Sequence, residues 1–306
     1  MKRLLVTGAT GFIGRHCVEL AVKRGYEVWA VRSGTTKSSE FPGSDEVNWR
    51  TLDLLDPNAL PAIIAESKAT HVLHSAWVTD HGSYWTSPMN LDWLAFGARF
   101  FRLFAESGGK RFVSVGTCAE YDWSHGYMVE DITPETAQTF YGKIKLAHHS
   151  TLMATSKQFG FSAATGRIFF AYGPFENAAR LIPYICRSLA SDQEAKLGNA
   201  QLYRDFMYVS DVANGLMALI ENDKSGPFNV SSGQPTRLLD IALTLGRIAH
   251  KPHLMKIENS VESDEQARMI VGSNKSLRLL GWKEEVGIEV GLEKAYRWWF
   301  DNRKKI

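Results

Sequence analysis

A glycine-rich segment near the start of the chain constrains the possible fold most strongly. The sequence VTGATGFIG follows an apolar run at residues 2–7 and leads into residues 14–24, whose apolar residues have helical spacing. Glycines between a strand and a helix let the chain turn sharply and let a diphosphate approach the helix amino terminus. An ordinary glycine turn is the alternative. We predict a dinucleotide site that includes Gly8, Gly11, Phe12, Ile13 and Gly14.

Strand-like and helix-like segments alternate after this loop. We expect strands at residues 26–32, 48–52, 70–76, 110–116, 162–173 and 226–233, and helices at residues 58–67, 90–107 and 141–159. The alternation predicts an α/β fold, a doubly wound parallel sheet of the Rossmann type with a smaller C-terminal substrate-binding lobe. We expect an NAD(P)-binding domain at residues 1–171, joined by residues 204–232. Residues 172–306 would mainly form the substrate lobe, with the last helix able to pack back on the first domain.

The composition points to a small ligand and a reducing environment. Lys and Arg number 35 and Asp and Glu 33, a balance that gives no electrostatic reason to expect nucleic acid or a membrane as partner. The cysteines Cys17, Cys118 and Cys186 are scattered, which suits neither a disulfide framework nor a zinc cluster, so we expect no metal. Glycines interrupt the first apolar run too early for a signal peptide. We therefore expect a cytoplasmic protein.

Two positions after predicted strands bear on the choice of cofactor. Arg32 ends the second strand where an aspartate would bind an adenosine ribose, and a guanidinium there can pair with a ribose phosphate instead. We therefore favour NADP(H), with NAD(H) possible, although Arg32 could simply be a solvated residue at a strand end. Asp53 follows the third strand and could contact adenine directly or through the neighbouring backbone of Leu54. A helix-capping role for Asp53 is the alternative.

The segment TFYGKIKLAHHS places a tyrosine four residues before a lysine in a predicted helix. Tyr141 and Lys145 therefore project from one face, and a nearby ammonium would lower the tyrosine pKa from about 10, so that the phenol exchanges protons near neutral pH. A surface tyrosine with a solvated lysine is the alternative. Ser114 and Thr117 lie near the end of the fifth strand, and we favour Thr117 for chemistry. Both hydroxyls could instead satisfy the local backbone.

The chain resembles the extended short-chain dehydrogenase/reductase family, specifically its nucleotide-sugar epimerase, dehydratase and reductase branch. The motifs that carry the resemblance are TGATGFIG, HSA, SVGTCAEY, YGKIK, YGP, RDFMYVSDVA and LGW. The resemblance implies that Thr117, Tyr141 and Lys145 form the catalytic triad, with Lys145 also holding the nicotinamide ribose. It implies that Arg204 binds the substrate diphosphate and that Asn90 is a structural polar residue. We also place Ala76, from the HSA motif, at the cofactor.

Several departures from the family pattern narrow the reaction. Dehydratases of this family have an acid and a base after the threonine, where this chain has Cys118 and Ala119, so dehydration is disfavoured. Glu120 is displaced along the loop, and we expect it to cap the loop or line the substrate pocket. An asparagine of many relatives is replaced at Phe170 or Ala171. The diphosphate would then rely on Arg180, Arg204 and Arg268, although surface ion pairs are the alternative for Arg180 and Arg268.

Aromatic and histidine side chains near the predicted site allow weaker assignments. Trp77, Tyr84 and Trp85 follow the fourth strand and could form an aromatic wall over the sugar or the nicotinamide, although core packing is the alternative. His74 and His81 form no convincing metal site. His148 and His149, on the helix of Tyr141, are expected to be structural or to lie at an interface.

These observations lead to one functional hypothesis and two rivals. We expect NADPH-dependent reduction of the 4-keto group of a nucleotide-diphospho-deoxysugar, with Tyr141 as the proton donor. A nucleotide-sugar 4-epimerase with retained cofactor would use the same residues. A non-catalytic dinucleotide sensor is a rival from another class. The family also implies a homodimer, and the apolar segment LDWLAFGARFFRLFA suggests that the helices at residues 90–107 and 141–159 form its interface.

Overall fold

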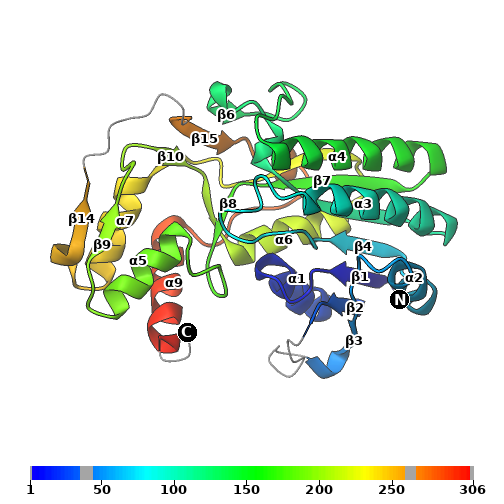
Figure 1. Ribbon diagram of the computed structural model, residues 1–306, viewed down its shortest axis with the longest axis horizontal. Coiled ribbons are helices and arrows are strands. Elements are labelled where there is room, and N and C mark those ends of the chain that lie inside the picture. Colours follow the sequence, from blue (N-terminus) through cyan, green and yellow to red (C-terminus); the bar gives the residue numbers. More distant parts are fainter. Residues whose placement is uncertain (1, 35–43, 259–266, 304–306) are drawn as a thin grey trace.

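A parallel sheet of seven strands forms the centre of the molecule in the computed structural model, which describes residues 2–34, 44–258 and 267–303 (Figure 1). The strand order is β12-β7-β5-β4-β1-β2-β3. These strands span Arg3–Thr7 (β1), Glu27–Arg32 (β2), Val47–Thr51 (β3), His71–His74 (β4), Arg111–Thr117 (β5), Ser162–Ile168 (β7) and Gly226–Val230 (β12). The chain changes direction across the sheet between β1 and β4, and ligands bind at such switch points. The predicted α/β fold is confirmed.

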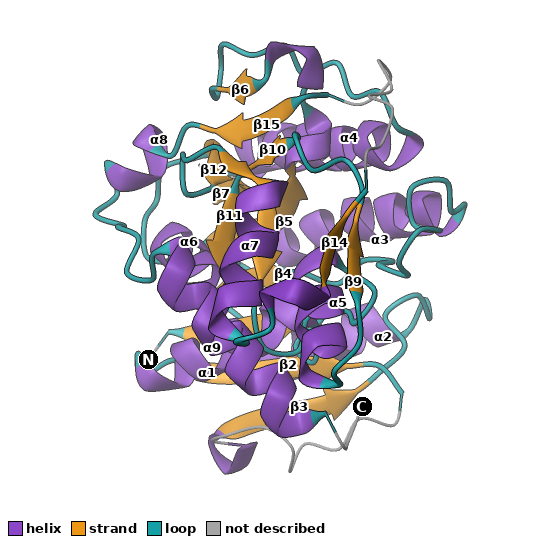
Figure 2. Ribbon diagram, turned by 90° about the vertical axis from the view of Figure 1, so that its left-hand side faces the viewer, coloured by secondary structure: helices purple, strands orange, loops and turns teal. Residues whose placement is uncertain are grey.

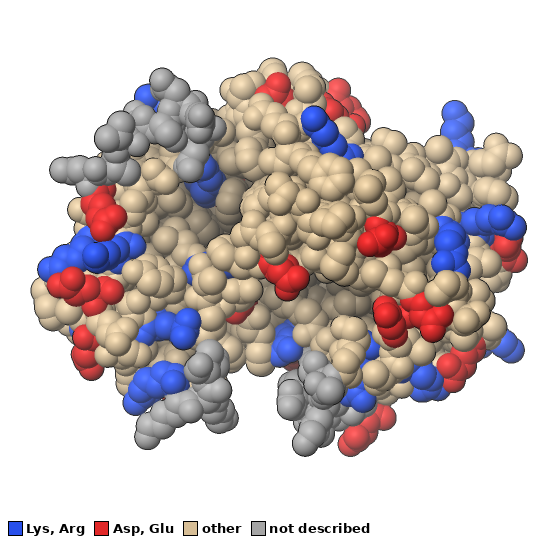
Figure 3. Space-filling model, viewed as in Figure 1, with Lys and Arg blue, Asp and Glu red and all other residues tan. Residues whose placement is uncertain are grey.

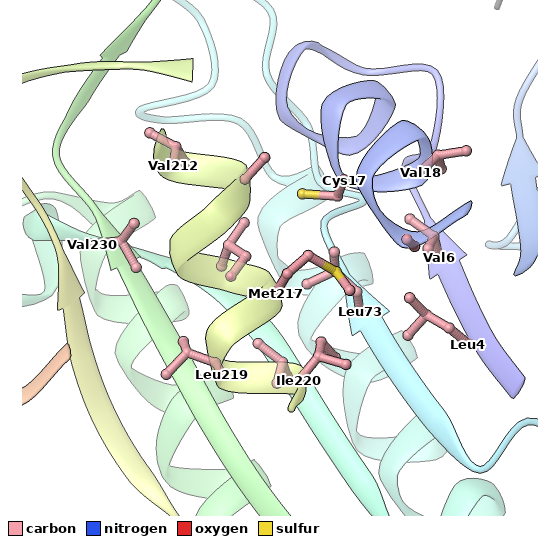
Figure 4. Close-up of a cluster of buried hydrophobic side chains, with 14 of the residues drawn as sticks. Leu4, Val6, Cys17, Val18, Leu73, Val212, Met217, Leu219, Ile220 and Val230 are labelled. Atoms are coloured by element: carbon pink, nitrogen blue, oxygen red, sulfur yellow. The ribbon is translucent and has the colours of Figure 1, made fainter. Parts of the chain in front are cut away.

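Helices cover both faces of this sheet. One face carries α1 (Phe12–Lys23) and α6 (Val209–Ile220), and the other carries α2 (Ala59–Ser67), α3 (Met89–Glu106) and α4 (Phe140–Phe159). Figure 4 shows Cys17 of α1 and Met217 of α6 among the buried side chains above Leu4 and Leu73 of the sheet. Apolar side chains on both faces explain why the central strands are continuous hydrophobic runs rather than alternating patterns.

The aromatic residues of α3 are buried within this chain. Phe96, Phe100, Phe101 and Phe104 pack with Phe112 of β5 in one core cluster. The high apolar content of α3 is thus explained by internal packing, because these rings already have partners in the same chain. The high apolar content of α3 is therefore no longer a reason to expect a dimer through α3 and α4.

A second lobe is built around three helices that lie in front of the sheet in Figure 2. They are α5 (Leu181–Ala190), α7 (Leu238–Ile248) and α9 (Ile288–Asn302), and α9 packs on both α5 and α7 around buried Trp299. The remaining elements are β6 (Tyr127–Met128), β8 (Phe170–Tyr172), β9 (Ala195–Leu197), β10 (Tyr203–Arg204), β11 (Phe206–Tyr208), β13 (Thr236–Arg237), β14 (Met255–Ile257), β15 (Met269–Gly272) and α8 (Lys275–Arg278). None of the helices in the described part of the chain is long and apolar enough to cross a bilayer.

The segment expected as one strand at residues 162–173 is two strands in different sheets. β7 ends at Ile168 within the central sheet, whereas β8 pairs with β11. Phe169 separates them because its buried ring packs over Gly272, where any Cβ would collide with it. The redirected chain carries β8 toward the second lobe. We propose the domain division given above, since β12 and α6 belong to the sheet layer. The last helix, α9, packs mainly with α5 and α7 of the second lobe rather than back on the first domain.

Candidate active site

The glycine loop has the shape that a dinucleotide requires. Gly8 has φ +67°, and a Cβ at this residue would lie 2.7 Å from the backbone nitrogen of Ala76. A Cβ on Gly14 would collide with the carbonyl oxygen of Gly8. α1 begins after Gly11, which provides no side-chain cap for the amides of the first turn. These residues fit a diphosphate, because the loop carries no side chains at Gly8 and Gly14 and the first N–H groups of α1 are available to an anion.

The residues assigned to the adenosine end lie at the carboxyl ends of β2 and β3. Arg32 is half-buried and its Nε donates to Thr51 Oγ1 at 2.9 Å. Asp53 is exposed, and its Oδ1 accepts from the backbone nitrogen of Leu55 at 3.0 Å. Asp53 thus stabilises a local turn and does not cap α2, whose N-cap residue is Asn58, while the neighbouring Leu54 is buried.

The end of β5 is shaped by a capping box. Thr117 Oγ1 accepts from the Ala119 nitrogen at 3.2 Å, and Glu120 Oε1 accepts from the Thr117 nitrogen at 2.9 Å. These reciprocal bonds close a single 3-10 turn, Cys118–Glu120, directly after the strand. They hold Thr117 at the carboxyl edge of the sheet, where a site was expected.

The prediction that Glu120 lines the substrate pocket is wrong. The side chain of Glu120 is fully buried and points inward, where its Oε2 accepts from Arg167 Nε at 2.8 Å. Arg167, on β7, also pairs with Glu135 and lies 4.4 Å from the centre of the Tyr121 ring. A carboxylate without solvent needs such a partner, so the arginine determines which way Glu120 points. Arg167 was not among the residues predicted for the site, although a lone charge inside the apolar run ATGRIFF indicates a buried ion pair.

Helix α4 brings Tyr141 to Thr117. Thr139 caps the helix by accepting from the Gly142 nitrogen at 3.0 Å. A Cβ on Gly142 would collide with the carbonyl oxygen of Ala119, so glycine lets the helix lie directly against the turn after β5. Tyr141 then comes close enough to Thr117 for the threonine hydroxyl to stabilise its phenolate. Lys145, one turn later, is only 5% exposed.

Burial shifts the pKa values of Tyr141 and Lys145 on α4. Burial lowers the pKa of Lys145 to about 8, and the negative charge of Glu120 opposes this shift. Burial raises the pKa of Tyr141 above its ordinary value, Tyr84 adds to the increase, and the Thr117 hydroxyl acts against it. The prediction of a lowered tyrosine pKa is therefore wrong for this structure. The Lys145 ammonium donates to the Val115 oxygen at 2.6 Å, and desolvation of the phenolate dominates.

The three aromatic residues after β4 contact Tyr141 and Lys145. Tyr84 and Trp85 meet the ring of Tyr141 edge to face, with centroid distances of 4.9 and 5.6 Å. The centre of the Trp77 ring lies 4.0 Å from Lys145 Nζ. Sequence reasoning placed these side chains at the site, and the structure packs them against Tyr141 and Lys145.

The histidines near the site are structural in this chain. His74 Nδ1 bonds to Thr7 Oγ1 at 2.7 Å, and His149 Nδ1 bonds to Thr165 Oγ1 at 2.8 Å. The buried ring of His148 packs over Gly97 between α3 and α4. Across the described ranges, no group of three or more His, Cys, Asp or Glu side chains could hold a metal ion.

The arginines proposed to bind the substrate lie across the crevice between the two lobes, on the side opposite Tyr141. Arg204, on β10, is half-buried, lies 5.7 Å from the centre of the Phe170 ring, and interacts electrostatically with Cys118. Arg180 precedes α5 and interacts with the Tyr84 hydroxyl, so it reaches across to the first lobe. Arg268 is exposed, and its carbonyl oxygen accepts from the Tyr203 nitrogen at 2.8 Å. Figure 3 shows the surface hollowed between the lobes, with basic side chains along the hollow.

Comparisons with known proteins agree with this geometry. The model of the NAD dependent epimerase/dehydratase family matches residues 4–231. A UDP-glucuronic acid decarboxylase 1 of Xenopus tropicalis is 25% identical, over 96% of this chain and 71% of its own. A CDP-abequose synthase of Salmonella muenchen is 23% identical over 96% of both chains. The solved Thermus thermophilus UDP-glucose 4-epimerase, in complex with NAD, has a TM-score of 0.86 at 23% identity, covering 98% of this chain and 99% of its own. The chain therefore belongs to the NAD dependent epimerase/dehydratase family.

Proposed function

We propose that this chain reduces the 4-keto group of a nucleotide-diphospho-deoxysugar, with Tyr141 as the proton donor. The observation that carries the proposal is the closeness of Tyr141 to Thr117, with Lys145 one turn later on α4 and bonded to Val115 of the strand that ends at Thr117. The bound nicotinamide supplies the hydride. Tyr141 gives its proton to the substrate oxygen, Thr117 donates a hydrogen bond to that oxygen, and Lys145 stabilises the phenolate that remains. A raised pKa keeps the phenol protonated at neutral pH, as a proton donor for reduction requires.

The turn after Thr117 argues against elimination of water. Cys118 and Ala119 occupy the positions at which a dehydratase would need its acid and base. Both carboxylate oxygens of Glu120 already accept hydrogen bonds, one from the Thr117 nitrogen and the other from Arg167, and the carboxylate faces the interior. Dehydration would need a base at the neighbouring carbon, and this turn supplies none.

We assign NADP(H) as the preferred cofactor because Arg32 lies at the carboxyl end of β2, beside the expected ribose. Its side chain already contacts Thr51, which orients the guanidinium at that edge of the sheet. We expect NADPH to bind at least about tenfold more tightly than NADH, and Arg32→Asp to remove most of this preference. Dissociation constants from quenching of intrinsic fluorescence would measure it. Equal affinities in the unmodified protein would reject the assignment.

We also propose a homodimer through the outer faces of α3 and α4. The support is the family resemblance together with the exposed, small or apolar α3 residues Leu91, Ala95 and Ala98. Sedimentation at micromolar concentration would test it, and Ala98→Glu should shift the population toward monomer. A monomer in the unmodified protein would overturn this proposal.

The activity itself is tested with a panel of nucleotide 4-keto-6-deoxysugars while NADPH absorbance is followed. A reductase consumes one NADPH per sugar. The 4-epimerase alternative would use the same three residues, and it would interconvert nucleotide sugars without net consumption. Tyr141→Phe should abolish turnover, whereas Tyr127→Phe, a matched change at an exposed tyrosine of β6, should not. Cofactor binding without turnover of any sugar would favour the non-catalytic sensor.

A further inference from the structure

Trp77 is held in a defined orientation behind the catalytic pair. Its Nε1 donates to Asn90 Oδ1 at 2.8 Å, and Asn90 is fully buried in the first turn of α3. The amide nitrogen of Asn90 donates to the carbonyl oxygens of Tyr84 and Ser87, both at 2.8 Å. One buried amide thus uses its acceptor and both donors to close the loop between β4 and α3. The plane of the indole is therefore determined by a saturated hydrogen-bond network rather than by loose packing.

The face of this indole is directed at Lys145. The ammonium lies 4.0 Å from the ring centre, and it also donates to the Val115 oxygen at 2.6 Å. An ammonium at this distance from an indole face is attracted by the ring quadrupole, and the attraction is strongest where water is excluded. The side chain of Lys145 is buried, so it meets that condition.

The other ionisable groups around Lys145 come from three elements. Glu120, in the turn after β5, is the anion whose charge reaches it, and that carboxylate already bonds to Arg167. His74 of β4 and His148 of α4 are close enough to feel the ammonium, but burial lowers the pKa of His74 to about 3 and holds that of His148 well below its usual value. Tyr141, a turn earlier on α4, is protonated at neutral pH. Beside the Val115 carbonyl oxygen, the indole is thus a second neutral group that favours the charged form of the lysine.

We propose that Trp77 is a positioning residue for Lys145, its indole face, oriented by Asn90, holding the ammonium one turn from Tyr141. The inference rests on the proposed function in one respect, because that function assigns Lys145 to the reacting pair. It gives Trp77 a role different from the aromatic wall over the sugar or the nicotinamide that its position after β4 suggested. Trp93 serves as the matched control for Trp77, because it is a second indole in the same cluster and stacks on Trp77 with a centroid distance of 6.2 Å.

The contact is tested without any substrate by nuclear magnetic resonance of the protein labelled with ¹³C-lysine. Lys145→Met identifies the signal of Lys145. We expect its ε protons to be shifted upfield by the ring current of Trp77, and its ε carbon to titrate near the pKa of about 8. Trp77→Leu should remove the upfield shift and lower the titration midpoint by about one pH unit, because the charged form loses the π face. Trp77→Phe should give an intermediate result, and Trp93→Phe should leave both readouts unchanged.

An accepted keto sugar adds a second readout. If Lys145 must be protonated, turnover falls as pH rises through its pKa, and Trp77→Leu should move this alkaline limb to lower pH by the same amount. Absence of the upfield shift in the unmodified protein, or an unchanged midpoint in folded Trp77→Leu or Trp77→Phe, would overturn the inference. Because the resonance experiment needs no sugar, failure of the proposed reaction and failure of this inference give different results.

Discussion

The two walls of the crevice are built in opposite ways. The wall that we call catalytic carries the proposed triad of Thr117, Tyr141 and Lys145 from the first lobe. Hydrogen bonds between partly buried groups hold the turn at Thr117, the start of α4 and the Lys145 ammonium. The other wall carries two arginines from the second lobe. Arg180 is exposed and interacts with Tyr84 of the first lobe, and Arg204 is half-buried and interacts with Cys118. Proton transfer requires reacting atoms at fixed distances, whereas a wall that admits a large substrate must stay open to solvent.

Two buried carboxylates show the same contrast. Glu120, in the catalytic wall, is paired with Arg167 at 2.8 Å. Glu176, in the loop after β8, is 8% exposed, and its Oε2 accepts a long bond of 3.4 Å from the Gly173 nitrogen. Burial raises the pKa of Glu176 to about 8, and the positive charge of Arg180 opposes this shift only in part. A buried carboxylate stays charged where an arginine bonds to it directly, and a charge that acts without such a bond offsets its burial less.

The largest expected effect lies in the catalytic wall. Tyr141→Phe should lower turnover by a factor of about 10² to 10⁴ with little change in the NADPH dissociation constant, because only the proton donor is lost. Lys145→Met should impair both turnover and cofactor binding, and Thr117→Val mainly turnover. Steady-state kinetics with one accepted keto sugar would measure these changes. Near-normal turnover in Tyr141→Phe would end the proposed mechanism.

The next effect concerns stability of the same wall. Glu120→Gln should lower the free energy of unfolding by about 2–4 kcal/mol, because it removes the charge that compensates buried Arg167. Glu135→Gln removes the other partner of Arg167 but changes an exposed carboxylate, so we expect a loss of about 1 kcal/mol or less. Urea unfolding would compare the two variants. Equal losses of unfolding free energy would show that the buried pair of Glu120 and Arg167 stabilises the fold no more than the pair with exposed Glu135.

A substitution in the second wall, which carries Arg180 and Arg204, should change KM rather than kcat. Arg204→Leu should raise KM about tenfold or more while changing kcat by less than about threefold, because a charge-assisted bond to the substrate diphosphate is lost from both ground and transition states. Arg297→Leu, on α9, changes an exposed arginine paired with Glu293 and should alter neither constant. A dominant loss of kcat in Arg204→Leu would place this arginine in the chemical step.

The smallest expected effect is a pH dependence in the second wall. The folded-state pKa of Glu176 is raised to about 8 from an ordinary value of 4.5, so between these pH values the folded state holds a proton that the unfolded state has lost. The contribution of this group to stability therefore falls as pH rises through that window. Glu176→Gln should raise the free energy of unfolding at pH 9, with little change near pH 4.

Thermal unfolding across this pH range would test the prediction for Glu176. Glu194→Gln, a change to an exposed carboxylate of the same lobe, provides the control and should leave the profile unchanged. A profile of Glu176→Gln parallel to that of the unmodified protein would mean that this carboxyl is ionised in the folded state.

Local patterns predicted much of the sheet and the glycine loop, and they failed where a distant partner decided the outcome. The break at Phe169 was missed because an apolar run does not reveal that its middle ring packs over Gly272. The direction of the Tyr141 pKa was wrong because helical spacing shows a neighbouring lysine but not the depth of burial. The dimer argument from α3 failed for a similar reason, since four of its phenylalanines are buried within the chain.

The sequence by itself determined the order of strands and helices, the glycine turn, and the spacing that puts Tyr141 and Lys145 on one face, because each depends on residues close along the chain. Only the tertiary structure decided where Glu120 points, since its partner Arg167 lies 47 residues later on another strand. The same holds for the indole of Trp77, whose contacts with Asn90 and Lys145 join three elements. Side-chain direction at such sites depends on which distant charges and rings the packed fold brings into contact.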